Sequence, residues 1–134
     1  MEYSANRMCF GCGPENPIGL HLVFSWEGER LVARFTPGDY HQSFKGVIHG
    51  GILSSMVDEA MGKYLWLKGL KAVTAEIHVR FRKPATAGEM LTVVSEKVKE
   101  KGRLFEMRAT VTLPGGETAV EATGKFVKVG VVGE

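Results

Sequence analysis

Residues 49–58 read HGGILSSMVD and place two adjacent glycines, Gly50 and Gly51, at an expected helix start, with a carboxylate, Asp58, two turns inside. A glycine pair lets backbone N–H groups approach a ligand closely, and the first N–H groups of a helix have no partner within it. Such groups stabilise the negative oxygen that develops during acyl transfer. We therefore expect an acyl-transfer site here, with Asp58 as base or nucleophile.

The same stretch opens a long helix. Apolar residues recur at helical spacing from Gly50 to about Leu67, and Gly69 predicts the end of the helix. The apolar positions are Ile52, Leu53, Met56, Val57, Ala60, Met61, Tyr64 and Leu65. The spacing predicts that most of this helix is buried.

Strands are expected on both sides of the helix. Two of them, Leu20–Trp26 and Arg30–Thr36, should form a hairpin. The irregular segment at residues 37–48 is a candidate substrate-binding loop. Runs rich in Val, Thr, Ile and Phe predict a meander of four more antiparallel strands, at Lys71–Arg82, Met90–Glu100, Arg103–Leu113 and Glu117–Val129. Because these strands bury the helix only if their sheet curls around it, we expect an α+β fold with an antiparallel sheet wrapped around one long central helix.

Length and composition exclude several classes of protein. The chain has 134 residues, enough for a single domain over 1–134 with an N-terminal segment at 1–19. A formal net charge of +2 is too small to indicate a nucleic-acid partner. No segment approaches the roughly eighteen uncharged apolar residues that cross a bilayer, and the N-terminus lacks the pattern of a secretion signal. We expect a soluble, cytoplasmic protein with no membrane partner.

Two cysteines stand close together in the N-terminal segment, as Cys9-Phe10-Gly11-Cys12. This spacing suits a metal knuckle or a redox pair in principle, but a zinc site needs two further ligands. The chain has no second such pair, and its four histidines are scattered. A cytosolic disulfide is also rare, so we expect a structural loop and no metal site.

Glu59 competes with Asp58 for the catalytic role. Adjacent helix positions differ by about 100° in direction, so only one of the two shares the face of Gly51 and Ser55. Asp58 lies seven residues after Gly51 and three after Ser55, near that face. We therefore favour Asp58 and expect Glu59 to form a cap or an ion pair.

The chain resembles a known family in several motifs at once. His49-Gly50-Gly51, Asp58 nine residues after the histidine, and Thr74-Ala75 opening a strand that ends at residues 81–84, FRKP, are together similar to the hotdog-fold acyl-CoA thioesterases. The similarity covers the chain from Cys9 to Val129. It is greatest to the phenylacetate-pathway and thioesterase-superfamily-member type.

The resemblance implies roles for five residues. Asp58 corresponds to the helix carboxylate that acts as nucleophile or as base for water. The backbone N–H of Gly50 would polarise the thioester carbonyl, with Gly51 beside it and His49 helping to position that carbonyl. Thr74 falls where relatives carry a hydroxyl that holds the attacking water near the carboxylate of the other subunit.

One position departs from the family pattern. Several relatives have an asparagine six residues before the histidine, where this chain has Ser43. His41 or Gln42 are alternative sources of polar support from that loop. His21 and His78, like His41, are interpreted as structural or surface residues.

Coenzyme A carries phosphates, so its site needs a few cations at the surface end of an apolar tunnel. Arg80, Arg82 and Lys83 fit at a strand end, and the resemblance adds the hairpin that contains Arg103. The alternative for these cations is a solvated strand face. Candidate acyl-pocket residues, each equally explained by core packing, are Phe44, Val47, Met56, Met61 and Tyr64.

The expected function is hydrolysis of an acyl-CoA thioester, which needs an oxyanion site and one carboxylate but no cofactor. The resemblance implies a homodimer, or a dimer of two such dimers, with the site at the interface. A second hypothesis is an acyl-CoA-binding or sensing protein without turnover. A hotdog hydratase ranks last, because the acid expected beside its histidine is missing.

Overall fold

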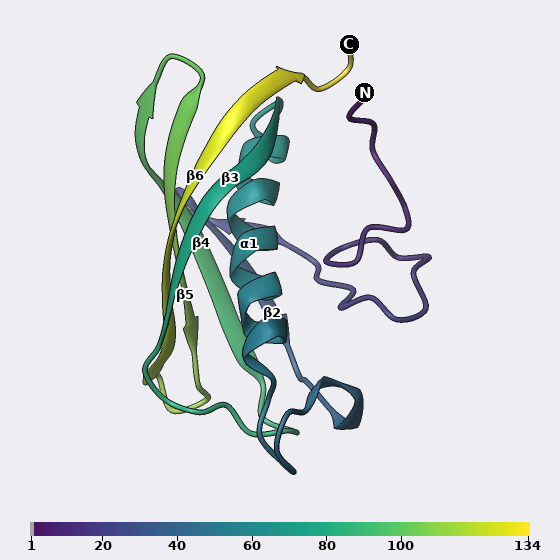
Figure 1. Cartoon of the computed structure of the whole chain (residues 1–134), viewed down its shortest axis with the longest axis vertical. Helices are drawn as coiled ribbons and strands as arrows, with labels where there is room; N and C mark the ends of the chain where they lie inside the picture. Colours follow the sequence, from purple (N-terminus) through teal and green to yellow (C-terminus); the bar gives the residue numbers. More distant parts are fainter. Residues whose placement is uncertain (1) are drawn as a thin grey trace.

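The computed structural model describes residues 2–134 and shows one long helix, α1 (Gly50–Leu67), lying along a curved antiparallel sheet (Figure 1). The strands are β1 (Ser25–Glu27), β2 (Arg30–Phe35), β3 (Leu70–Phe81), β4 (Leu91–Lys101), β5 (Leu104–Thr112) and β6 (Thr118–Val131). A short 3-10 turn, η1 (Asp39–His41), lies in the loop before α1. The α+β architecture expected from the sequence is confirmed.

The helix begins and ends where the sequence predicts. His49 is its N-cap residue, and Gly69 follows its last turn with a φ of 89°, a left-handed conformation that favours glycine. One face of α1 is buried against the sheet, through Leu53, Met56, Val57, Ala60, Met61, Tyr64 and Leu65. These side chains form one core with the inward-facing residues of β2, β4, β5 and β6. Among the described residues, no helix has the length and apolar character to span a membrane.

The strand order, β1-β2-β4-β5-β6-β3, differs from the predicted meander. β3 does not pair with β4, which follows it in sequence, but lies at the sheet edge against β6. Residues 84–89, which connect the two strands in sequence, bond instead to the loop before α1, through Ile48 N–H to Ala85 O and Gly88 N–H to Pro37 O. This connection is a crossover, so the prediction of a meander was wrong for β3.

The first predicted strand is also shorter than expected. Only Ser25–Glu27 pairs with β2, whereas Leu20–Trp26 was expected to do so. Leu20 and Leu22 donate their N–H groups to Phe10 O and Gly11 O in the N-terminal segment, and His21 has a φ of 53°. The chain therefore breaks away from the sheet before residue 25. Figure 1 shows the N-terminal segment on the side of α1 that faces away from the sheet.

Candidate active site

At the start of α1, the N–H groups of Gly50 and Gly51 differ in their hydrogen bonding. The Gly51 N–H donates to Nδ1 of His49 at 2.8 Å, which caps the helix and leaves the imidazole proton on Nε2. The Gly50 N–H has no acceptor within residues 2–134. Of the two candidate oxyanion donors, Gly50 is therefore the one whose N–H remains available.

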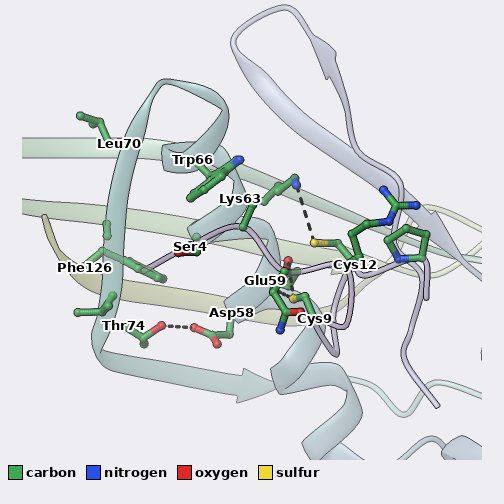
Figure 2. A pocket seen from close by; sticks show the side chains of 17 residues that line it. Ser4, Cys9, Cys12, Asp58, Glu59, Lys63, Trp66, Leu70, Thr74 and Phe126 are labelled. Carbon is green, nitrogen blue, oxygen red and sulfur yellow. Dashed lines mark hydrogen bonds between the residues drawn. The ribbon is translucent and has the colours of Figure 1, made fainter. Parts of the chain in front are cut away.

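Asp58 lies half-buried two turns further along α1. The Thr74 hydroxyl on the edge strand β3 donates a 2.8 Å hydrogen bond to Asp58 Oδ1, as Figure 2 shows. No group of the described residues donates to Oδ2, which is left to accept a proton from a water or to attack a carbonyl. The resemblance implies that Thr74 holds the attacking water near the carboxylate of the other subunit. Within one chain, the structure places the Thr74 hydroxyl beside Asp58.

Asp58 and Gly50 are too far apart to serve one carbonyl within a single chain. Eight residues separate them, which corresponds to about 12 Å along a helix with a rise of 1.5 Å per residue. A reacting atom has to lie roughly 3 Å from both the nucleophile and the oxyanion donor. One chain therefore presents two half-sites rather than a complete one.

The half-site at Asp58 opens into a cavity of about 610 Å³ between α1, β3 and the N-terminal segment. Asp58 and Thr74 lie at one side, and the apolar part of the lining comes from Trp66, Leu70, Ala72 and Phe126. The N-terminal segment closes another side with residues from Ser4 to Pro14. A cavity of this volume is in the usual range for small-molecule sites.

The residues suggested for an acyl pocket do not line this cavity. Phe44 points into solvent with 83% of its surface exposed, while Met56 and Met61 are fully buried in the core. Tyr64 is also buried, and Val47 lines the other half-site. The apolar spacing identified the face of α1 that is buried in the core. Gly62, Lys63 and Trp66, on another face of the helix, line the cavity.

The half-site at Gly50 lies beside a smaller cavity of about 340 Å³. Phe81, Arg82 and Lys83, at the end of β3, share its lining with Gly50. Arg82 donates from Nε and Nη2 to Glu121 Oε2 at 3.2 and 3.1 Å, whereas no carboxylate of the described residues pairs with Lys83. Two of the predicted CoA-binding cations therefore lie next to the available N–H group.

The other two predicted cations are placed differently. Arg80 is exposed on β3 and is not part of the Gly50 cavity. Arg103 donates two hydrogen bonds to Lys128 O, next to the point where Val127 pairs with Val73. Val73 and Arg82 are nine residues apart on an extended strand, about 30 Å. Within one chain, Arg103 and the strand-end cations do not form one site.

The loop before α1 uses its polar side chains internally. Nδ1 of His41 accepts from Gly38 N–H, and the Gln42 amide oxygen accepts from Gly46 N–H. Ser43, at the position of the family's asparagine, is exposed and donates its backbone N–H to Val47 O. The His41 and Gln42 side chains thus stabilise the loop, and all three residues lie outside both cavities.

Sequence reasoning missed a polar cluster that joins two cysteines of the N-terminal segment to Glu59 and Lys63 of α1. Cys9 Sγ lies 3.7 Å from each carboxylate oxygen of Glu59, and Lys63 Nζ lies 3.8 Å from Cys12 Sγ. Burial, reinforced by a hydrogen bond with Glu59, raises the pKa of the Cys12 thiol to about 12. The close cysteine pair was the available signal, but its partner is fifty residues away in the sequence.

A helix cradled by a curved antiparallel sheet, with a glycine pair at the helix start and a carboxylate two turns inside, defines a hotdog domain. The sequence profile of the Thioesterase superfamily matches residues 45–130, and the chain belongs to that superfamily. Over 131 residues it is 30% identical to acyl-coenzyme A thioesterase THEM4 of Bos taurus, which covers 96% of this chain and 54% of that protein. The chain thus spans about half the length of this curated relative.

Solved structures show the same fold. The E. coli PaaI protein from the phenylacetic acid degradation operon superposes with a TM-score of 0.78 and 22% identity, covering 84% of this chain and 82% of its own. A Streptococcus mutans protein solved bound to acetyl CoA gives a TM-score of 0.76 and 22% identity, covering 82% and 88% respectively. At these identities the similarity establishes the fold alone.

Proposed function

We propose that this protein hydrolyses an acyl-CoA thioester to a carboxylic acid and free CoA. The observation that carries the proposal is the pair of half-sites, an available Gly50 N–H beside surface cations and an Asp58 carboxylate beside a largely apolar cavity. A thioester carbonyl is already electrophilic, so an oxyanion donor and one carboxylate meet the needs of the reaction. Membership of the Thioesterase superfamily and the name of the Bos taurus relative support the same activity.

The proposed reaction needs two copies of the chain. Gly50 of one protomer polarises the carbonyl, and Asp58 of its partner removes a proton from water or attacks the carbonyl itself. In the first route the oxygen of water adds to the carbonyl carbon, the carbon–sulfur bond breaks, and the CoA thiolate takes up the proton that Asp58 removed. In the second route the Asp58 oxygen adds and the thiolate leaves, and water then hydrolyses the resulting anhydride to the free acid and regenerates Asp58. The 12 Å separation along α1 supports a homodimer, because it keeps the two groups of one chain apart. Thr74 orients the carboxylate, and His49 fixes the backbone beside Gly50.

The cavities suggest how the substrate lies. The apolar cavity beside Asp58 suits the acyl group, and Lys83 and Arg82 suit the phosphates of CoA. Arg80 and Arg103 are proposed to reach the nucleotide from the assembled oligomer. A dimer of two such dimers is the alternative assembly for this proposal.

Release of free thiol from short, long and aromatic acyl-CoAs tests the proposal. We expect native turnover, and a loss of about 10²-fold to 10⁴-fold in Asp58→Asn, because general-base contributions have this size. Asp39→Asn is the matched control, since Asp39 is exposed in the loop before α1 and lies outside both cavities. Unimpaired turnover in Asp58→Asn would overturn the assignment. Tight acyl-CoA binding without turnover in the native protein would favour the alternative of a sensing protein.

A further inference from the structure

The cluster on the far side of the cavity from Thr74 contains two thiols and a carboxylate that converge on one point. The donor atoms of Cys9, Cys12 and Glu59 all lie within 4.8 Å of one another. Zinc binds sulfur at about 2.3 Å and carboxylate oxygen at about 2.0 to 2.2 Å, so its tetrahedral ligands stand roughly 3.5 to 3.8 Å apart. The 3.7 Å between Cys9 Sγ and the Glu59 oxygens already has this value.

The backbone around the cluster is shaped to bring these groups together. A Cβ on Gly11 would lie 2.5 Å from the Glu59 side chain, and one on Gly13 would lie 2.3 Å from Cys9 N. Gly13 N–H also donates to Cys9 O at 2.8 Å, which folds the two cysteines into a compact turn. Glycines at 11 and 13 therefore let the turn pack directly on the carboxylate.

The charges around the cluster balance for a divalent cation. Two thiolates and one carboxylate carry three negative charges, of which the ion neutralises two. Lys63, with Nζ 3.8 Å from Cys12 Sγ, supplies the remaining positive charge and donates to a metal-bound sulfur. Thiolate ligands select zinc over magnesium or calcium, which prefer oxygen.

We propose that Cys9, Cys12 and Glu59 bind a zinc ion that ties the N-terminal segment to α1. Each thiol releases its proton to solvent on binding, and the fourth coordination position is filled by water. The third ligand, Glu59, comes from α1 and lies fifty residues after Cys9 in the sequence. This proposal does not depend on the thioesterase activity.

The position of the ion indicates its effect. The N-terminal segment forms one wall of the 610 Å³ cavity, and Glu59 is the neighbour of Asp58 on α1 (Figure 2). Backbone hydrogen bonds attach the segment mainly to itself, with Leu20 and Leu22 as its links to the core. A metal at Glu59 would therefore fix that wall against the helix beside the catalytic carboxylate.

Titration of the reduced, chelator-treated full chain with Co²⁺ tests the site, because cobalt occupies zinc sites and its thiolate bonds absorb in the near ultraviolet. We expect one equivalent bound per chain, with the thiolate band lost in Cys9→Ser and Cys12→Ser. Glu59→Gln should weaken binding about tenfold or more. Asp58→Asn, one position away, should bind as the native chain does, whatever its turnover.

A measurement on the native sequence removes any dependence on substitutions. Hydrogen exchange of residues 2–24 should slow on addition of Zn²⁺ and not on addition of Mg²⁺, and should quicken again with chelator. Absence of a thiolate–cobalt band in the reduced protein would overturn the proposal. So would a band unchanged in Cys12→Ser, or a Cys9–Cys12 disulfide that persists in the presence of zinc and thiol reductant.

Discussion

The hydroxyl of Thr74 donates a 2.8 Å hydrogen bond to Oδ1 of Asp58, across sixteen residues of sequence. The bond occupies one carboxylate oxygen of Asp58, which lines the cavity, and leaves Oδ2 without a donor among the described residues. In the proposed reaction, Thr74 is therefore a positioning residue that acts through the orientation of Asp58.

Removal of that hydroxyl should slow turnover without preventing binding. A hydrogen bond to a charged group contributes about 1.5 to 3 kcal/mol, so we expect Thr74→Val to lower kcat roughly tenfold or more, with KM little changed. Thr74→Ser keeps the donor and should recover most of the rate. Equal kcat values for the valine and serine variants, measured by thiol release, would show that the bond has no part in turnover.

The Gly50 N–H can be deleted without disturbing the helix. Proline is well tolerated at the first helical position, and His49 already has the φ of −61° and ψ of 132° that a residue before proline adopts. A Cβ at Gly50 would meet Phe81 at an ordinary 3.4 Å. Gly50→Pro should lower kcat by about 10²-fold to 10³-fold.

Gly50→Ala is the control for this change, because alanine keeps the N–H. Its thermal midpoint and that of the proline variant should both stay near the native value. If the two variants lose the same activity, the side-chain volume and not the hydrogen bond is responsible.

Mixing two inactive variants distinguishes a shared site from a site within one chain. In a hybrid dimer of Asp58→Asn and Gly50→Pro chains, one of the two shared sites keeps both native groups. Statistical reassembly after denaturation and refolding should restore about a quarter of native turnover per chain. No recovery, with hybrid dimers verified by mass spectrometry, would place the complete site within one chain.

Ser95 provides a test of the core that leaves both cavities untouched. It is the buried polar side chain among the core residues, and its hydroxyl donates a 2.7 Å hydrogen bond to Ala60 O in α1. Ser95→Ala should reduce the free energy of unfolding by about 1 kcal/mol in urea denaturation. Ser25→Ala, on an exposed edge strand, should change it by less than about 0.5 kcal/mol. Equal effects at both positions would contradict the role of the buried bond.

The sequence predicted the elements whose signals are local. The glycine at position 69 and the apolar spacing gave both ends of α1, and the placement of Asp58 and Thr74 followed from the family spacing. Strand pairing is a long-range property, so the Val, Thr, Ile and Phe content that predicted a strand at Lys71–Arg82 did not reveal that β6 is the partner of β3. The predicted first strand, Leu20–Trp26, included His21, whose positive φ leaves no trace in the sequence pattern.

The site was predictable to the extent that its residues form one motif. His49 and Gly50 were recognised together as parts of one motif. That the Gly51 N–H is bonded while the Gly50 N–H is not depends on the orientation of the His49 imidazole. The approach of Glu59 to Cys9 depends on how the N-terminal segment crosses α1, which no local pattern encodes. The family resemblance grouped Arg103 with Arg82, although the sheet of one chain places them near opposite ends.

The place of β3 at the sheet edge has a consequence for folding during synthesis. β3 follows α1 directly in the chain, yet in the described residues its sheet partner is β6, which ends at Val131. A ribosome adds about 5 to 20 residues per second, so α1 emerges seconds before β6. The part of its apolar face that packs on β6 then remains uncovered until residues 118–131 have left the exit tunnel. A product that ends before residue 118 would therefore lack the sheet partner of β3 and leave part of the apolar face of α1 exposed to water.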